Sequence, residues 1–294
     1  MLTGVFPIIA PIFACVAVGY VWKLLKQPFD SQMISRLVIM VGAPALIIST
    51  LDKAPIAIPL LQKMALVCFA LLAIFLIVGA VCLKLLALDV RGYVGTLAFP
   101  NVGNMGLPLC LFAFGDKGLS LGLAFFMLIS VVHFSFGILL FAGGSWLKAF
   151  TNNPIIYSVA AGIFMIYTDT ELPEWAARSL DLIGSFTIPM MLIALGASLA
   201  GLRVAYFKDS LILSLLRLAL GLGAGWLVTE FMGLTGIERG VVILQAAMPT
   251  AVFNYMFANQ YQRNSQQVAG MVLISTLISF VSLPWLLLWA KGQL

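Results

Sequence analysis

The sequence predicts an all-α polytopic membrane protein with ten transmembrane helices. Hydrophobic residues make up 62% of the 294 positions and charged residues only 9%, against roughly 25% charged in an ordinary soluble domain. A water-soluble protein of this size could not cover its surface with so few charges. The basic residues that give the net charge of +5 are spread singly along the chain. Soluble, disordered and nucleic-acid-binding classes are therefore excluded, and the expected surroundings are a lipid bilayer.

Ten apolar runs follow one another along the chain, each of a length suited to one membrane crossing. They cover about residues 5–22, 31–50, 60–86, 91–113, 117–142, 154–168, 175–200, 209–233, 239–260 and 266–290. The loops between them are short, which leaves no room for a soluble domain. The four cysteines lie singly inside these runs with no Cys-x-x-Cys pair, so neither a disulfide nor a metal site is expected.

The basic residues lie unevenly on the two sides of the predicted membrane. With the N-terminus outside, nine fall in inner loops and six in outer segments, which the positive-inside rule favours. The first positive charge, Lys23, follows the first run, so that run is expected to be a retained span and not a cleaved signal peptide. We therefore expect a multi-pass protein of the cell membrane with both termini outside.

The chain repeats itself at an offset of about half its length. Matching residues 145 to 149 positions apart are Pro44 and Pro189, Leu128–Ser130 and Leu273–Ser275, Arg91-Gly92 and Arg239-Gly240, and Pro100 and Pro249. This offset divides the chain into a first five-span repeat, residues 1–145, and a second, residues 146–294. An odd number of spans inverts the second repeat in the membrane, which is an architecture of secondary transporters.

Helix-breaking and polar residues interrupt the fourth and ninth runs. In the fourth run these residues are Pro100, Asn101, Gly103, Asn104, Gly106 and Pro108. Proline removes a backbone donor and clashes with the preceding turn, so a continuous helix is not expected. The ninth run has a matching break from Gln245 to Asn254 that contains Pro249 and Thr250. Unwound backbone in a membrane must be buried in protein or line a cavity, and paired breaks predict a transporter binding site there.

Each break presents a helix N-terminus, whose free N–H groups and partial positive charge suit carboxylate or phosphate groups. The side chains of Asn101, Asn104 and Asn254 can add amide donors for an anion or carbonyl oxygens for a cation. Sodium could use oxygens of Asn104, Gln245, Thr250 and Asn254. No acidic residue lies in the middle of spans 3, 4, 5 or 9, so a proton has no obvious carrier. Sodium and proton coupling both stay open, and no cofactor is expected.

The stretch Pro-Asn-Val-Gly-Asn-Met-Gly-Leu-Pro at 100–108 closely resembles the fourth span of the auxin efflux carrier family. Pro249-Thr250-Ala251 with Asn254, and the run Ile193–Leu199, also resemble that family, and the resemblance covers essentially the whole chain. The family is similar in fold to the sodium–bile acid symporters, with ten spans in two inverted repeats. The resemblance implies that spans 1, 2, 6 and 7 form a scaffold that dimerises. Spans 3–5 and 8–10 would form a moving unit in which broken spans 4 and 9 cross.

The same resemblance implies that substrate binds at the crossing. The residues implied are Pro100, Asn101, Gly103, Asn104, Gly106, Pro249, Thr250 and Asn254, with Gln245 and Arg217 as ion or charge partners. Plant members have a long hydrophilic loop between spans 5 and 6, whereas this chain has only about 143–153. A compact prokaryotic member is therefore indicated, with malate- or malonate-type carboxylates favoured over auxin-like acids as substrates.

Two alternatives accompany the carrier hypothesis. A passive anion channel could use the same breaks, although an inverted repeat favours a carrier. Ser130 and His133 in the fifth run could form an intramembrane hydrolase pair, but no orienting third group or oxyanion loop accompanies them. A hydrogen-bonded helix contact is the better interpretation of His133. Arg217, inside the eighth run, could contact an anion or a mobile charge, or extend toward the headgroups.

Overall fold

The computed structural model describes residues 6–53, 57–137, 140, 154–168, 170–202 and 206–291, and within these ranges the regular elements are all helices. Five described segments are long and apolar enough to cross a membrane, namely Ile58–Leu85, Val102–Val132, Glu174–Gly201, Phe207–Phe231 and Ser265–Ala290. Large apolar side chains such as Phe69, Ile77 and Phe231 lie exposed on the outer helices, as lipid contact requires. The predicted multi-pass membrane protein is therefore confirmed.

The helices follow the predicted apolar runs. Those before residue 140 are α1 (Phe6–Leu24), α2 (Ser31–Leu37), the π-helical turn η2 (Val38–Gly42), α3 (Ala43–Lys53), α4 (Ile58–Leu85), α5 (Val90–Ala98), the π-helical turn η3 (Val102–Gly106), α6 (Leu107–Val132) and the π-helical turn η4 (His133–Gly137). Those after residue 153 are α9 (Pro154–Thr168), α10 (Glu174–Ser185), α11 (Thr187–Gly201), α12 (Phe207–Phe231), α13 (Gly236–Ala246), α14 (Val252–Gln260) and α15 (Ser265–Ala290). The predicted repeat boundary at 145/146 and the loop at about 143–153 lie outside the described residues.

Both predicted breaks are present. Helix α5 ends at Ala98 and helical structure resumes at Val102, while α13 ends at Ala246 and α14 begins at Val252. The expected loop between the fourth and fifth runs is replaced by a kink inside α6, where Gly115 alone leaves the helical conformation with φ 67°. Glycine adopts this left-handed region without the steric cost of a Cβ, so one residue turns the chain.

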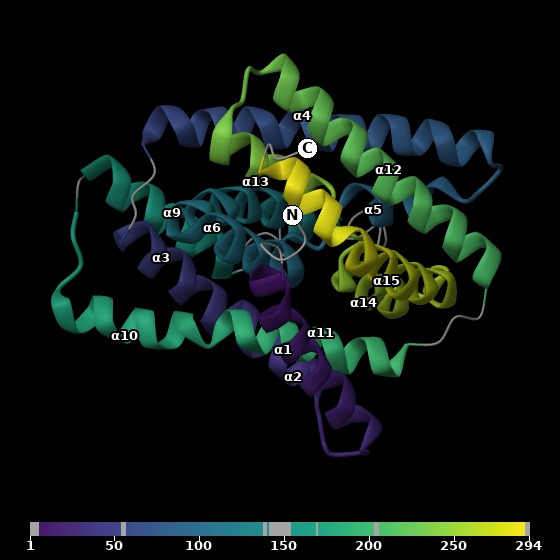
Figure 1. The fold of residues 1–294 in the computed structure, drawn as a ribbon, viewed down its shortest axis with the longest axis horizontal. Helices are drawn as coiled ribbons and strands as arrows, with labels where there is room; N and C mark the ends of the chain where they lie inside the picture. The colour runs from purple at the N-terminus through teal and green to yellow at the C-terminus, as the bar shows by residue number, and fades with distance from the viewer. Residues whose placement is uncertain are drawn as a thin grey trace.

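The helices pack in two groups. In the first group α1 runs along α11, and α3 packs against α9 and α10. The backbones of α1 and α11 approach closely, because a Cβ on Gly19 would lie 1.9 Å from the Ile193 carbonyl oxygen and one on Gly196 would lie 1.9 Å from that of Val16. In the second group α12 packs against α4, α13 and α15. Figure 1 shows α4 and the α10–α11 pair at opposite edges of the molecule, with α6 and α9 between them.

Candidate functional site

The two broken segments lie against each other and pair as a short antiparallel bridge. The Asn101 N–H donates to the Pro249 carbonyl at 2.7 Å, and the Ala251 N–H donates to the Phe99 carbonyl at 3.1 Å. Backbone groups freed from a helix in a membrane need such partners, because lipid offers none. Each break therefore supplies the hydrogen bonds that the other lacks.

Two side chains of the second break fasten it to the first. The Thr250 hydroxyl donates to the Thr96 carbonyl at 2.6 Å, and the Asn254 amide Nδ2 donates to the Phe99 carbonyl and to Thr250 Oγ1, both at 3.0 Å. Thr250 and Asn254 are fully buried. Both were predicted to bind substrate, and in this structure these polar atoms hold the two segments together.

His133, at the start of η4, makes the contact that was expected of it, and its partner is the crossing. Its Nε2 lies 2.9 Å from Asn254 Oδ1. Because Nδ2 of Asn254 faces the Phe99 carbonyl, Oδ1 is the atom left for the histidine, so Nε2 is the donor. The imidazole also stacks on the Phe99 ring, with centroids 4.2 Å apart, and meets the edge of Phe257 at 5.5 Å. The ring is thus held on both sides.

A small, partly enclosed cavity of about 30 Å³ lies beside the crossing. Four predicted site residues line it: Pro100, Asn101, Gly103 and Asn104. The wall also includes Val102, Ala251 and Phe253 from the broken segments and Phe126, Ser130 and His133 from α6 and η4. The opposite wall, which the sequence analysis did not identify, consists of Val38, Ile39, Ala43, Ile155 and Met191. This volume accommodates about one or two water molecules, so it is closed to a dicarboxylate.

Asn101 provides the clearest sign of a ligand at this cavity. Its side chain is 4% exposed, lines the cavity, and leaves Nδ2 without a hydrogen-bond partner. A buried donor left unsatisfied costs about 1–3 kcal/mol. The helical stretch from Val102 into α6 begins at the same place, so its N-terminal partial positive charge faces the cavity as well. An acceptor atom entering the cavity would meet both.

Two further predicted site residues, Gly106 and Gln245, lie outside the cavity wall. A Cβ on Gly106 would lie 2.0 Å from Gln245 Oε1, so α6 and α13 meet there. Gln245 is fully buried, and its Nε2 donates to the Gly122 carbonyl at 3.4 Å. Neither Gly106 nor Gln245 lines the cavity. On the wall itself, a Cβ on Gly103 would lie 2.8 Å from Met191 Cε, so this position accepts no larger residue without movement.

Arg217 of α12 is fully buried on another side of the crossing. Its Nη1 donates to the Leu97 carbonyl at 2.8 Å, Nη2 to Ala246 at 2.6 Å, and Nε to Met248 at 3.3 Å. The guanidinium also lies 4.5 Å from the centre of the Phe75 ring. The Leu97 and Ala246 carbonyls belong to the C-terminal ends of α5 and α13, which carry partial negative charge, and Met248 lies in the break that follows α13. Arg217 therefore joins both broken helices and does not extend toward the headgroups.

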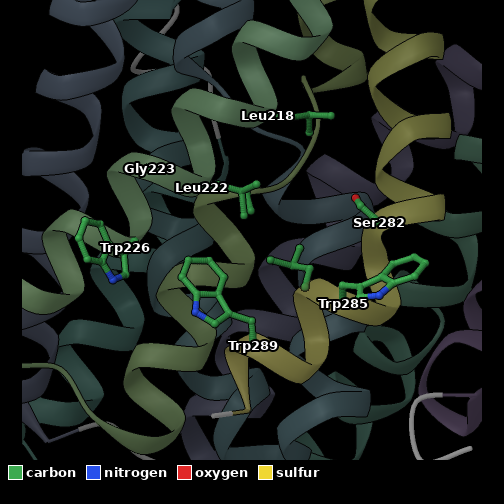
Figure 2. Close-up of a pocket in the computed structure, with 9 residues that line it drawn as sticks. Leu218, Leu222, Gly223, Trp226, Ser282, Trp285 and Trp289 are labelled. Atoms are coloured by element: carbon green, nitrogen blue, oxygen red, sulfur yellow. The ribbon is translucent and has the colours of Figure 1, made fainter. Parts of the chain in front are cut away.

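A larger cavity, of about 530 Å³, lies between α12 and α15. Figure 2 shows Trp226 of α12 with Trp285 and Trp289 of α15 around it, and Ser282 as its hydroxyl-bearing side chain. Its almost entirely apolar wall offers a charged or polar substrate few partners. Within the described residues, moreover, no group of three His, Cys, Asp or Glu side chains could hold a metal ion. The crossing cavity is thus the candidate site.

Comparison with known proteins identifies relatives that are membrane transport proteins. The membrane transport protein family matches residues 5–145 and 138–287. An uncharacterized transporter of Methanocaldococcus jannaschii is 24% identical over 94% of this chain and 97% of its own length. One from Methanothermobacter thermautotrophicus is 25% identical over 95% of both chains. A Rhizobium meliloti protein named "Putative malonate transporter" is 24% identical over 95% of this chain and 94% of its own.

Proposed function

The chain belongs to the auxin efflux carrier-type family of membrane transport proteins, and we propose that it is a secondary carrier of small organic anions working by alternating access. The observation that carries this proposal is the pair of broken helices bonded to each other beside a cavity with an unpartnered amide donor. Malonate- and malate-type carboxylates are the first substrates to test, since one relative is named for malonate.

Recognition of an anion at this site relies on dipoles and amides. The helical stretches that begin at Val102 and Val252 start beside the cavity, whose wall includes their neighbours Asn101 and Ala251. Helix N-termini bind carboxylates without a charged side chain. The Asn101 Nδ2 donor lacks a partner, and Asn104 adds a second amide to the wall. A carboxylate in the cavity would thus receive hydrogen bonds from side chain and backbone alike.

The difference between the two cavity walls supports alternating access. The wall formed by η2, α3, α9 and α11 consists of Val38, Ile39, Ala43, Ile155 and Met191, all apolar side chains. The hydrogen bonds described above join the two broken segments with α5, α12 and η4. The broken segments could slide along the apolar wall with little loss of hydrogen bonding. The two segments would move together as a unit, because hydrogen bonds join them to each other. The cavity of about 30 Å³ must widen for substrate to enter.

The proposal extends to the complete architecture. Helices α1 to α3 and α9 to α11 would be the scaffold, and α4 to α6 with η4 and α12 to α15 the moving unit. Together they would make ten spans in two inverted repeats, with both termini outside and a homodimer formed through the scaffold. The two packing groups and the repeated residues at an offset of 145 to 149 support this arrangement.

Counterflow in proteoliposomes tests the carrier hypothesis. Trapped unlabelled substrate should accelerate uptake of labelled malonate, malate or succinate, because a carrier exchanges one molecule for another across its alternating site. A passive channel would equilibrate the label without that acceleration. Absence of counterflow with every acid of a panel that also contains indole acetate would refute organic-anion transport.

A further inference from the structure

The wall of the crossing cavity contains one titratable side chain, His133. The other described lining residues, contributed by η2, α3, η3, α6, α9, α11 and the two broken segments, include no Asp, Glu, Lys, Arg, Cys or Tyr. The buried Arg217 is bonded to three carbonyls and lies outside the cavity wall. Any change of charge within the wall is therefore a change at His133.

The hydrogen bond between His133 Nε2 and Asn254 Oδ1 tolerates both protonation states of the imidazole. Nε2 donates to Asn254 Oδ1 at 2.9 Å, and the Asn254 amide is fixed by the Phe99 carbonyl and Thr250 Oγ1. Neutral imidazole with its hydrogen on Nε2 and imidazolium both donate from that atom. Protonation consequently adds a positive charge to the cavity wall while the bond that holds the crossing is kept.

A carboxylate and a proton each make binding of the other more favourable in this cavity. A carboxylate surrounded by apolar side chains and neutral donors loses hydration that these groups replace only in part. An imidazolium in the same surroundings is also unfavourable when it is alone. Together the two charges compensate each other, so their binding is linked with positive and reciprocal coupling.

We propose that His133 is the proton-binding site of this carrier, so that each carboxylate crosses the membrane together with one proton held on the His133 imidazole. The proton is taken from water on one side and released to water on the other, and no other reactant is needed. This inference rests on the proposed carrier function and specifies its coupling ion.

Most of the oxygens that a sodium ion could use at the crossing already accept hydrogen bonds, Gln245 Oε1 being an exception without a partner. In carriers with broken helices, half-helix C-terminal ends and unwound carbonyls coordinate sodium. Here the Leu97, Ala246 and Met248 carbonyls accept hydrogen bonds from the Arg217 guanidinium. Of the side-chain oxygens considered for sodium, Asn254 Oδ1 faces the His133 N–H and Thr250 Oγ1 accepts from Asn254. The Arg217 guanidinium thus already uses three backbone carbonyls of the kind that would coordinate a coupling sodium ion.

The test uses the full chain in proteoliposomes that contain a pH-sensitive dye, with the membrane potential clamped at zero. Malonate uptake by the wild type should acidify the lumen. An inward gradient of one pH unit should raise malonate accumulation about tenfold for one proton per substrate, and a sodium gradient should have no effect. The His133→Gln variant keeps an amide donor for Asn254 but cannot carry a proton. It should bind malonate more weakly than the wild type, because the coupled positive charge is lost, and the counterflow that remains should proceed without luminal acidification and without gradient-driven accumulation.

Ser120→Ala is the matched control, because Ser120 is buried in α6, bonds the Asp116 carbonyl of its own helix and lies outside the cavity wall. It should couple to protons as the wild type does. Luminal acidification by His133→Gln, or wild-type accumulation that follows sodium instead of pH, would overturn the inference. Absence of wild-type counterflow would instead refute the carrier hypothesis.

A calorimetric measurement keeps the inference testable if His133→Gln does not fold. Titration of purified wild-type protein with malonate in buffers of different ionisation enthalpy reports the protons taken up on binding. One proton per malonate is expected near neutral pH. Malonate binding without proton uptake would contradict the assignment to His133.

Discussion

Replacing Arg217 by methionine should separate the two broken helices from each other. The variant keeps an apolar stem of similar length inside α12 and removes a guanidinium that binds three carbonyls. Each carbonyl left without a partner costs about 1–3 kcal/mol, and loss of one partner from a buried charged arrangement costs about 3–5 kcal/mol. The three hydrogen bonds share one guanidinium group, and the structure around the variant should relax in part. We therefore expect Arg217→Met to lower the free energy of unfolding by about 3–5 kcal/mol.

The effect should be visible as a loss of thermal stability. At about 2–4 °C per kcal/mol for a domain of this size, the melting temperature of Arg217→Met should fall by roughly 10 °C, and counterflow should fall with it. Arg217→Lys keeps the charge but concentrates its donors at one nitrogen, so it should lose about half as much. Both melting temperatures are measured on purified protein in the same detergent.

The same variants show whether Arg217 stabilises the crossing or contacts the substrate. If Arg217 contacted the anion, its replacement by lysine should weaken malonate binding and leave the stability of the substrate-free protein unchanged. Arg217 lies outside the cavity wall, so folded Arg217→Lys should bind malonate with wild-type affinity. An unchanged melting temperature for Arg217→Met, or a malonate affinity lost in Arg217→Lys, would refute the assigned role.

Three further substitutions test the site and the scaffold. Asn101→Ala removes the unpartnered amide; it should weaken malonate binding about 10- to 100-fold, the value of one hydrogen bond to a charged group, at no cost in melting temperature, and wild-type affinity by calorimetry would contradict this. Asn254→Ala removes two donated bonds and the His133 contact, so counterflow should vanish and stability should fall by about 2–4 kcal/mol; a wild-type melting curve would be the opposing result. Gly196→Ala places a Cβ 1.9 Å from the Val16 carbonyl oxygen and should separate α1 from α11 with a cost of about 1–3 kcal/mol, whereas Gly223→Ala, which meets nothing within 4 Å, should melt with the wild type; equal melting of the two would contradict the close approach.

The positions of the breaks could be predicted because their cause is local. Pro100 and Pro249 each remove a backbone donor and disfavour helix in the preceding turn, and each is followed directly by a polar residue, Asn101 or Thr250. The partners of the broken backbone could not be predicted, since the bridge joins residues about 150 positions apart. Asn254 was predicted to bind substrate, and its amide donates hydrogen bonds to Phe99 and Thr250 that hold the crossing together; an amide group can serve either purpose.

The rest of the cavity wall gives no signal in the sequence. Val38, Ile39 and Met191 line the cavity. Apolar residues of the same types occur in membrane helices whether the position faces lipid, the protein core or a cavity, so the residue type does not identify a cavity wall. His133 has a polar signal, yet its partner Asn254 lies 121 positions away. Only the tertiary arrangement relates these residues to the crossing.

The electrostatics of the crossing explain how a chain with few charges can offer a site to an anion. Two broken helices bring two C-terminal ends and two N-terminal starts together in the membrane. Carbonyl groups at the C-terminal ends of α5 and α13 accept hydrogen bonds from Arg217. The N-terminal ends of the helical stretches that follow each break adjoin the cavity. Negative and positive helix ends would otherwise offset each other at the crossing. Because the buried Arg217 offsets the negative ends, we expect a positive potential in the cavity although none of its described lining residues is charged, and loss of Arg217 should weaken anion selectivity as well as stability.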